Sequence, residues 1–383
     1  MPPLYFVVPW YPDRPSGGAE LLTKQTAQEL RRRGVDARVL TTCVAEFRSD
    51  WGINARPRGR ATVDGVPVER FPADRRDWRL FDQVNRRLMR GEPVTPVEAE
   101  LYVEENLRSR ALETRLLDLP PDAVILYVPY LFGTSYWGLE ARPGWLLPCL
   151  HDEPYARLPP FGRLFRRATG VLCNSPAERE LVLRLYGLDP GAVLTIGAGV
   201  EAGTGPDGLP PPLEPPYLLC VARKDHGKNV DGLLSDFARC RAARSGLRLA
   251  LIGPGTLPVP AGLAERVVDL GFQPEAAKRA AYAGAIAHVV PGTQESFSLV
   301  LMEAWLCGAP ALVNARCDVT REHVRAASGG LAYDGAEELS AAVDWLLAHP
   351  AAARRMAENG REYVRRNFDW DVVVARLRRA LGV

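Results

Sequence analysis

The sequence of 383 residues predicts an α/β protein of two domains, each built around a mainly parallel β-sheet. The chain is longer than one ordinary hydrophobic core requires. It opens with a short apolar run, a glycine-containing loop, a stretch of helical periodicity and a second apolar run, which is typical of parallel α/β sheets. A Gly- and Pro-rich stretch at residues 201–216 predicts a linker, and the same alternation restarts after it.

The elements of the first domain follow from apolar runs and helical periodicity. Residues 4–8 form a short apolar run that predicts a buried strand. Residues 19–33 have helical periodicity and stop before Gly34, which suits a C-cap. The other predicted strands are residues 35–41, 66–71, 123–128, 145–150, 170–174 and 193–196, and the other predicted helices are residues 78–90 and 96–117.

The second domain repeats the pattern. Its predicted strands are residues 217–222, 248–252, 267–270, 286–290 and 311–314, and its predicted helices are residues 229–244, 274–283 and 297–306. The last segment begins at Asp369, a good N-cap residue, and predicts an amphipathic helix.

Composition excludes several classes of protein. The formal net charge is +2, so no overall field favours nucleic acid. The seven Cys include no Cys-x-x-Cys pair, and several lie in apolar runs, so we expect buried free thiols. The N-terminus lacks a basic region and a long apolar run, and no stretch is long enough to cross a bilayer. We therefore expect a cytoplasmic protein.

Two carboxylates, Glu295 and Glu303, flank a segment that suits a phosphorylated sugar ligand. Glu295 lies on a small, polar turn, and Glu303 lies in the helix that follows it. A turn that feeds a helix offers free backbone N–H groups and a positive dipole end for phosphate. The carboxylates can accept hydrogen bonds from sugar and ribose hydroxyls.

The Glu-x7-Glu spacing does not stand alone. It is accompanied, in order, by Gly17-Gly-Ala-Glu20, His151-Asp152, Val221-Ala-Arg-Lys-Asp-His-Gly-Lys-Asn229, Leu251-Ile-Gly-Pro-Gly255, Leu270-Gly-Phe-Gln-Pro274 and Cys307-Gly-Ala-Pro310. Along nearly its whole length the chain resembles the GT4 family of retaining nucleotide-sugar glycosyltransferases. The resemblance implies the GT-B fold, two Rossmann-like domains with parallel sheets that face a central cleft. It implies an N-terminal acceptor domain at 1–200, a donor domain at 217–366, and a C-terminal helix at about 367–383 that packs back on the first domain.

The resemblance also implies a nucleotide-sugar donor site. Arg223 and Lys228 match the residues that hold the diphosphate; composition alone would favour a solvated basic loop. Glu295 matches the carboxylate that binds the transferred sugar, and Glu303 matches the one that binds the ribose. The backbone N–H groups of Ser298, Leu299 and Val300 are expected to face the phosphates.

The remaining donor contacts come from glycine-containing turns. Gly17 and Gly18, which have no side chain, are expected to approach the phosphates, or else form a plain tight turn. Gly253 and Phe272 are expected beside the ribose and base. The chain has Glu295-Ser-Phe-Ser298 where many relatives have Glu-Gly-Phe-Gly, which affects the geometry around the donor sugar and leaves the sugar undetermined.

His151 is implied as a catalytic residue beside the anomeric carbon, together with Glu295, Arg223 and Lys228. Asp152 and Glu153 are implied near the acceptor. Three consecutive residues cannot all face one ion from a regular strand, so we expect no metal site and no cofactor beyond the donor. A purely structural histidine is the alternative.

The expected activity is transfer of a hexose-type sugar, with retention, from a UDP- or GDP-linked donor to a glycan, lipid-linked or small-molecule hydroxyl, in surface polysaccharide or glycoconjugate biosynthesis. The alternatives are a non-catalytic nucleotide-sugar binding protein, and an epimerase or phosphorylase of the same architecture. Two basic, aromatic stretches, residues 75–90 and 157–167, suit either docking on an anionic membrane, as a peripheral protein on its inner face, or solvated helix faces.

Overall fold

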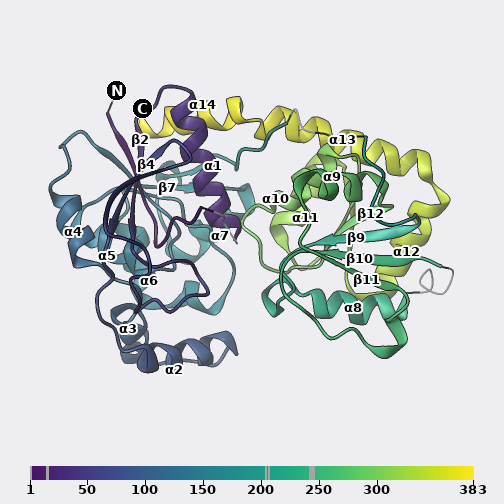
Figure 1. Ribbon diagram of the computed structural model, residues 1–383, viewed down its shortest axis with the longest axis horizontal. Helices are drawn as coiled ribbons and strands as arrows, with labels where there is room; N and C mark the ends of the chain where they lie inside the picture. The colour runs from purple at the N-terminus through teal and green to yellow at the C-terminus, as the bar shows by residue number, and fades with distance from the viewer. Residues whose placement is uncertain (1, 14–16, 203–204, 206–207, 241–245) are drawn as a thin grey trace. The chain divides into compact units, whose positions relative to one another are not determined.

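The computed structural model describes residues 2–13, 17–202, 205, 208–240 and 246–383, and these divide into two compact units. Unit 1 comprises Met1–Gly199 together with Val373–Val383, and unit 2 comprises Val200–Val372. Parts of the expected linker (203, 204, 206 and 207) and the end of the helix expected at 229–244 lie outside the described residues. Each unit is built around its own sheet (Figure 1).

Unit 1 has an eight-stranded sheet in the order β3-β4-β2-β1-β5-β6-β7-β8. All neighbouring strands are parallel except the edge hairpin β3–β4. The strands are β1 (Leu4–Val7), β2 (Ala37–Thr42), β3 (Gly59–Val63), β4 (Val66–Phe71), β5 (Val124–Tyr127), β6 (Trp145–Leu146), β7 (Gly170–Cys173) and β8 (Val193–Thr195). The central strand β1 is buried throughout, as expected of a strand covered on both faces.

The helices of unit 1 cover this sheet and carry its core. They are α1 (Gly18–Arg32), α2 (Trp78–Met89), α3 (Pro96–Glu104), α4 (Arg110–Leu117), α5 (Gly133–Ala141), α6 (Pro159–Arg167) and α7 (Pro176–Tyr186), with short 3-10 turns η1 (Pro154–Arg157) and η2 (Pro190–Ala192). The residues from Val373 onward in α14 (Trp370–Leu381) also belong to this unit, and Arg376 donates a hydrogen bond to the carbonyl of Ile196.

Unit 2 has a six-stranded parallel sheet in the order β11-β10-β9-β12-β13-β14. The strands are β9 (Tyr217–Val221), β10 (Arg248–Ile252), β11 (Val267–Gly271), β12 (Ala287–Val290), β13 (Ala311–Asn314) and β14 (Gly330–Tyr333). Numbered from one to six along the unit, this order is 3-2-1-4-5-6, which is the doubly wound dinucleotide-binding topology.

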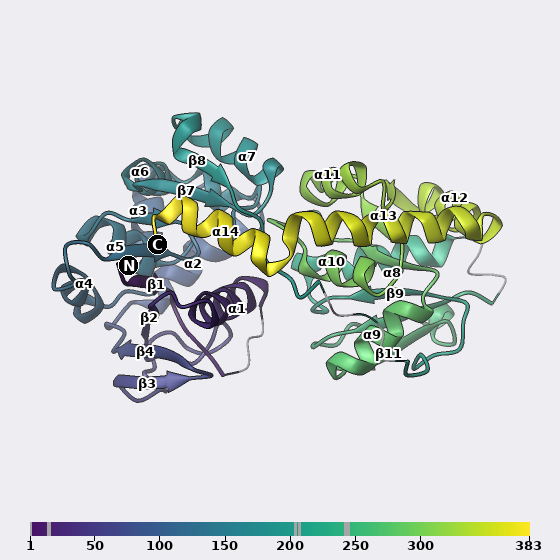
Figure 2. The ribbon, with the colours of Figure 1, turned by 90° about the horizontal axis from the view of Figure 1, so that it is seen from above.

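Helices flank the sheet of unit 2 on both faces. They are α8 (Val230–Arg239), α9 (Glu275–Gly284), α10 (Leu299–Leu306), α11 (Asp318–Ala327), α12 (Gly335–Ala348) and α13 (Pro350–Phe368), with 3-10 turns η3 (His226–Lys228) and η5 (Ala261–Leu263). Figure 2 shows α13 lying along α10 and α11, with which it is in contact.

The structure corrects two of the expected elements. The helix expected at 96–117 is two helices, because Asn106 and Ser109 bond the backbone between them. Asn106 Oδ1 accepts the N–H groups of Leu107 and Gly133, and Ser109 Oγ caps α4 at Leu112. The strand expected at 145–150 ends at Leu146, because Pro148 has no N–H and Cys149 has a positive φ of 51°. Strands β3 and β14 and helices α5, α7, α11, α12 and α13 were not expected.

All seven cysteines are free, as predicted, and six of them are fully buried. Among the described residues, no helix is long and apolar enough to cross a bilayer.

Candidate functional site

The strand order of unit 2 brings two loops together at one edge of the sheet. Strands β9 and β12 are neighbours, and the strand order reverses between them. Because both strands run in the same direction, the loops that follow them, residues 222–229 and 291–298, leave the sheet at the same edge. Ligands of doubly wound sheets bind at this reversal point, outside the carboxyl ends of the strands.

A salt bridge joins these two loops. Lys228 Nζ donates to Glu295 Oε1 at 2.7 Å, and the two side chains are 27% and 12% exposed. The loops are held by amides as well, because Asn229 Nδ2 and Asn314 Nδ2 each donate to the carbonyl of Pro291 at 3.0 Å. The structure therefore brings together a cation and a carboxylate that lie 67 residues apart in the chain.

The two basic residues next to each other on the first loop have different environments. Arg223 is partly exposed, with its Nε 3.2 Å from Asp225 Oδ2. Lys224 is buried; its Nζ donates to the carbonyl of Gly253 at 2.7 Å and lies 2.6 Å from Asp269 Oδ1. Lys224 thus ties neighbouring loops together, whereas Arg223 and Lys228 present their cations at the edge of the sheet.

Helix α10 begins directly after the second loop. Its N-cap, Ser298, has a left-handed backbone (φ 73°, ψ 75°), and its buried Oγ forms no hydrogen bond. The carbonyl of Ser298 accepts the N–H of Leu301. The first turn of an α-helix leaves its N–H groups without intrahelical acceptors, and this applies to Leu299 and Val300. The helix thus directs N–H donors and its positive dipole end toward the loop that carries Glu295.

Glu303 lies one turn further along α10. Its carboxylate is paired with Lys278 of α9, at 3.0 Å between Nζ and Oε2. No signal in the sequence pointed to Lys278, since a lysine in a predicted surface helix is ordinary.

Gly253 and Phe272 follow β10 and β11 at the same edge of the sheet. A Cβ atom at Gly253, whose φ is 136°, would lie 2.0 Å from the carbonyl oxygen of Ala222, so this position requires glycine. Phe272 is 80% exposed, which is unusual for a phenylalanine, and it leaves an aromatic ring at the end of the edge strand.

In unit 1, Gly17 and Gly18 start α1 after β1. Gly17 is the N-cap, with φ −128° and ψ 159°, and its N–H donates to Glu20 Oε2. Among the residues that the structure describes, a Cβ atom at Gly18 would meet nothing within 4 Å, and one at Gly17 would make only ordinary contacts with Glu20. Neither the backbone conformation nor the packing of unit 1 therefore requires glycine here.

His151 lies five residues after the end of β6 and is partly exposed. Its Nδ1 is 3.9 Å from Glu153 Oε1, and its carbonyl accepts the N–H of Glu153. Glu153 also accepts the hydroxyl of Tyr130 at 2.7 Å. The two oxygens of Asp152 accept from Arg157 and Arg184, so this carboxylate is engaged within unit 1.

The sequence analysis missed Glu178, which holds the backbone of Leu150 next to His151. Glu178 is buried in α7, and its two oxygens accept the backbone N–H groups of Leu150 and Asn174. Burial raises the pKa of this carboxyl to about 7, although both hydrogen bonds and the nearby His151 oppose the shift. The Ser175-Pro-Ala-Glu178 pattern resembles a capping box, but a contact with Leu150 could not be read from it.

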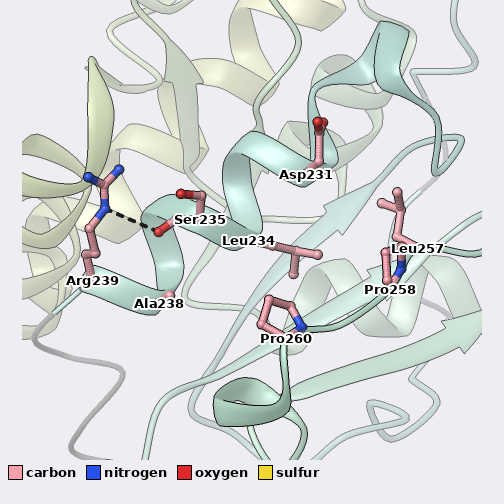
Figure 3. A pocket seen from close by; sticks show the side chains of 8 residues that line it. All are labelled: Asp231, Leu234, Ser235, Ala238, Arg239, Leu257, Pro258 and Pro260. Atoms are coloured by element: carbon pink, nitrogen blue, oxygen red, sulfur yellow. Dashed lines mark hydrogen bonds between the residues drawn. The ribbon is translucent and has the colours of Figure 1, made fainter.

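A hollow of about 710 Å³ lies elsewhere on unit 2, between α8 and residues 257–260 (Figure 3). Apolar side chains such as Leu234 and Pro260 face one another across it, and Arg239 bonds the carbonyl of Ser235. It contains none of the predicted site residues. Within the described ranges, no three His, Cys, Asp or Glu side chains are grouped as metal ligands would be.

Comparison with known proteins shows the family to which the chain belongs. The model of glycosyl transferases group 1 matches residues 206–363, and that of the glycosyl transferase 4-like domain matches residues 17–199. D-inositol 3-phosphate glycosyltransferase 2 of Catenulispora acidiphila is 30% identical over 297 residues, covering 64% of this chain and 68% of the relative.

Solved structures show the same fold along the whole chain. Sucrose-phosphate synthase from Thermosynechococcus elongatus is 20% identical, with a TM-score of 0.71 over 99% of this chain and 98% of that chain. The Anabaena protein HepE, solved with UDP and glucose, is 17% identical, with a TM-score of 0.71 over 100% of both chains. The chain has the GT-B fold, as its resemblance to the GT4 family implied. The chain is therefore a member of the group 1 glycosyltransferase family, of the GT4 type.

Proposed function

We propose that the chain is a retaining glycosyltransferase that moves a hexose-type sugar from a nucleoside diphosphate sugar, UDP- or GDP-linked, to a hydroxyl acceptor. The observation that carries the proposal is the Lys228–Glu295 pair at the reversal point of the sheet. A cation and a carboxylate on adjacent loops supply the two kinds of contact that a diphosphate and a sugar need. The names of the relatives support the donor class, since HepE was solved with UDP and glucose.

In the proposed donor complex, Lys228 exchanges Glu295 for the diphosphate. Arg223 adds a second cation, and the N–H groups of Ser298, Leu299 and Val300 add neutral donors. Glu295 is then released to accept hydroxyls of the sugar. Negative charge develops on the diphosphate as it leaves, so fixed cations and N–H donors aimed at it stabilise the transition state.

The reaction balances without a further reagent. The bond from the anomeric carbon to the diphosphate oxygen breaks, and the acceptor oxygen bonds to the same face of that carbon. The acceptor proton passes to the leaving phosphate oxygen, and the products are the glycoside and the free nucleoside diphosphate. Because the leaving group takes the proton, no pair of carboxylates at glycosidase spacing is needed.

Unit 1 is proposed to bind the acceptor and to approach the donor. Gly17 and Gly18 are glycines that unit 1 itself does not require, which favours a close approach of backbone to phosphate over a plain turn. His151 is proposed beside the anomeric carbon. Glu153 is a better acceptor-binding candidate than Asp152, because both oxygens of Asp152 already accept from arginines.

The acceptor class is proposed from the family and its relatives. Glycan, lipid-linked and small-molecule hydroxyls all fit a group 1 enzyme of surface polysaccharide or glycoconjugate biosynthesis, and several relatives are named for an inositol phosphate acceptor. Transfer to inositol 3-phosphate is a direct first assay.

Thermal unfolding with UDP, GDP, ADP and dTDP tests the donor site. Binding to the folded state raises the melting temperature by mass action. We expect a rise with UDP or GDP, lost in Lys228→Ala but kept in Arg239→Ala, which removes an exposed cation from α8 of the same unit. A rise that survives in Lys228→Ala would show that this site is wrongly assigned.

Hydrolysis of the matching nucleotide sugar without acceptor distinguishes an enzyme from a binding protein. We expect slow hydrolysis with retained anomeric configuration, unchanged by EDTA and abolished in Glu295→Ala. Nucleotide binding without any turnover would favour the non-catalytic alternative, and loss of turnover with EDTA would contradict the proposed metal independence.

We also propose that α2 contacts an anionic membrane surface. Trp78 and Met89 lie three turns apart on one side of α2 and are 54% and 72% exposed, beside the exposed Arg79, Arg86 and Arg90. In the second basic stretch, by contrast, Phe161 and Phe165 are buried in the core of unit 1.

Flotation with phosphatidylglycerol vesicles at low salt tests the membrane proposal. We expect the chain to float with these vesicles and not with phosphatidylcholine, and Trp78→Ser/Met89→Ser to remain at the bottom. Ile53→Ser, which changes an exposed apolar residue outside α2, is the matched control. No flotation at low salt would refute the proposal.

A further inference from the structure

One face of α9 presents three polar side chains near Glu303 of α10. Glu275, Lys278 and Tyr282 are spaced at i, i+3 and i+7, which places them on the same side of the helix. Lys278 Nζ is 2.9 Å from Glu275 Oε1 and 3.0 Å from Glu303 Oε2. The hydroxyl of Tyr282 donates to the same Oε2 at 3.4 Å. Two donors from α9 therefore converge on one oxygen of Glu303.

The pKa of Glu303 is raised overall, but the two contacts from α9, with Lys278 and Tyr282, favour its ionised form. Burial raises the pKa of Glu303, and Lys278 opposes that shift by its charge and hydrogen bond. Burial alone would lower the pKa of Lys278, but Glu303 and Glu275 outweigh it, and the pKa is raised. An ionised carboxylate accepts hydrogen bonds and donates none, so Glu303 is prepared for a ligand that brings hydroxyl donors.

The second oxygen of Glu303 remains open. Both contacts from α9 use Oε2, and within the described part of the chain no hydrogen bond or ion pair uses Oε1. The side chain is 28% exposed, in contrast to 13% for Lys278. The carboxylate is thus held at Oε2 and is partly exposed, on the helix that leads away from the proposed phosphate-binding turn.

In the proposed donor site Glu303 takes the ribose, as the family resemblance implies. We infer that Lys278 is a positioning residue: it holds Glu303 by Oε2, leaves Oε1 for the vicinal hydroxyls, and thereby sets how strongly the site prefers ribonucleotides over 2′-deoxyribonucleotides. The inference rests on the proposed donor site and adds what sets its sugar selectivity. A lysine that only joined α9 to α10 would affect stability but would leave the ratio of the two affinities unchanged.

Titration calorimetry with UDP and 2′-deoxy-UDP tests this inference, with GDP and 2′-deoxy-GDP measured in the same way. The wild type should prefer the ribonucleotide roughly tenfold, the loss expected for one charge-assisted hydrogen bond. Lys278→Met should reduce the ratio to about twofold, and Lys278→Arg should restore most of it. The ratio is the right readout, because both nucleotides carry the same diphosphate and a lost positive charge weakens them alike.

Two variants serve as comparisons. Glu303→Gln should lower the preference for ribonucleotides as much as Lys278→Met does, without changing α9. The double variant Lys278→Met/Glu303→Gln should have the same ratio of affinities as Glu303→Gln alone. Glu275→Gln removes the other partner of Lys278 and should keep the wild-type ratio.

The outcomes separate the two proposals. A wild-type ratio retained in Lys278→Met, or equal binding of both nucleotides to the wild type, overturns the inference and leaves the donor site standing. Binding of none of the four nucleotides overturns the donor site, and the inference with it.

Discussion

Two local features of Ser298 lower the stability of the folded chain. Its left-handed backbone costs a residue with a Cβ atom about 1 kcal/mol, and its buried hydroxyl, without a partner, costs about 1 kcal/mol more. Ser298→Gly removes both features, offset by about 0.5–1 kcal/mol of backbone entropy. We expect a net gain of roughly 1 kcal/mol in the free energy of unfolding, measured in urea. Ser298→Ala should gain less, because it keeps the strained backbone; a loss of stability in Ser298→Gly would contradict this account.

Glu178 should make unit 1 sensitive to pH. Its folded pKa of about 7 lies above the ordinary 4.5 of the carboxyl, so the folded chain binds this proton more tightly than the unfolded chain does. Stability must therefore fall as pH rises from about 4.5 to 7, by on the order of 3 kcal/mol, and level off above that range.

Glu178→Gln removes this titration. Its free energy of unfolding should carry a constant offset from the lost acceptor at Leu150 or Asn174, but the fall between pH 4.5 and 7 should be absent. Denaturant unfolding at several pH values, followed by the fluorescence of the whole chain, measures the difference. Parallel pH curves for the variant and the wild type would show that Glu178 is ionised throughout.

At the scale of elements, the loops after β9 and β10 are packed against each other at Gly253. Gly253→Ala would place a Cβ atom 2.0 Å from the carbonyl oxygen of Ala222 and impose an unfavourable φ. We expect a loss of about 3 kcal/mol in stability and weaker nucleotide binding, because Arg223 moves with Ala222. Gly262→Ala, where a Cβ atom meets nothing within 4 Å, is the control and should unfold like the wild type.

The sequence predicted elements well where the pattern was local. Apolar runs predicted most of the strands, and Glu295 was correctly placed on a turn that precedes a helix. The prediction of a single helix at 96–117 was wrong, because the hydrogen bond between Asn106 and Gly133 joins residues distant in sequence. Pro148 within the expected strand 145–150 was a local signal that the apolar pattern outweighed.

Residues that support the site from a second element were not predictable. Glu178 and Lys278 act through contacts with Leu150 and Glu303, which lie 28 and 25 residues away. Periodicity shows which face of a helix is buried, but it does not show which helix lies opposite. The same reason explains why the aromatic residues of 157–167 were expected at the surface and are buried in the core of unit 1.

For the whole molecule, the two units should respond to acid in opposite directions. Burial lowers the pKa of His288 to about 4 and of His323 to about 3, and both residues lie in unit 2. The unfolded chain takes up these protons below about pH 6.5 while the folded unit does not, so unit 2 loses stability as pH falls from 6.5 toward 4. Over the same range, protonation of Glu178 favours unit 1.

Calorimetry at pH 5 and pH 7.5 tests this opposition. We expect one unfolding transition for each unit, and the transition whose midpoint temperature falls in Gly253→Ala is assigned to unit 2. We expect the midpoint temperature of the unit 2 transition to be lower at pH 5 than at pH 7.5, and that of the unit 1 transition to be higher. A shift of both in the same direction would show that these buried groups do not dominate the pH response.

The path of the chain has a consequence for its synthesis. Unit 1 is completed by Val373–Val383, which leave the ribosome only after the whole of unit 2. Val373, Leu377 and Leu381 are buried, so the apolar surface that they cover stays open to water until translation of this segment. Unit 2 is a single segment of the chain and can fold first, although it is synthesised after most of unit 1. A nascent chain stalled before residue 373 is therefore a natural client for a chaperone that shields the first unit.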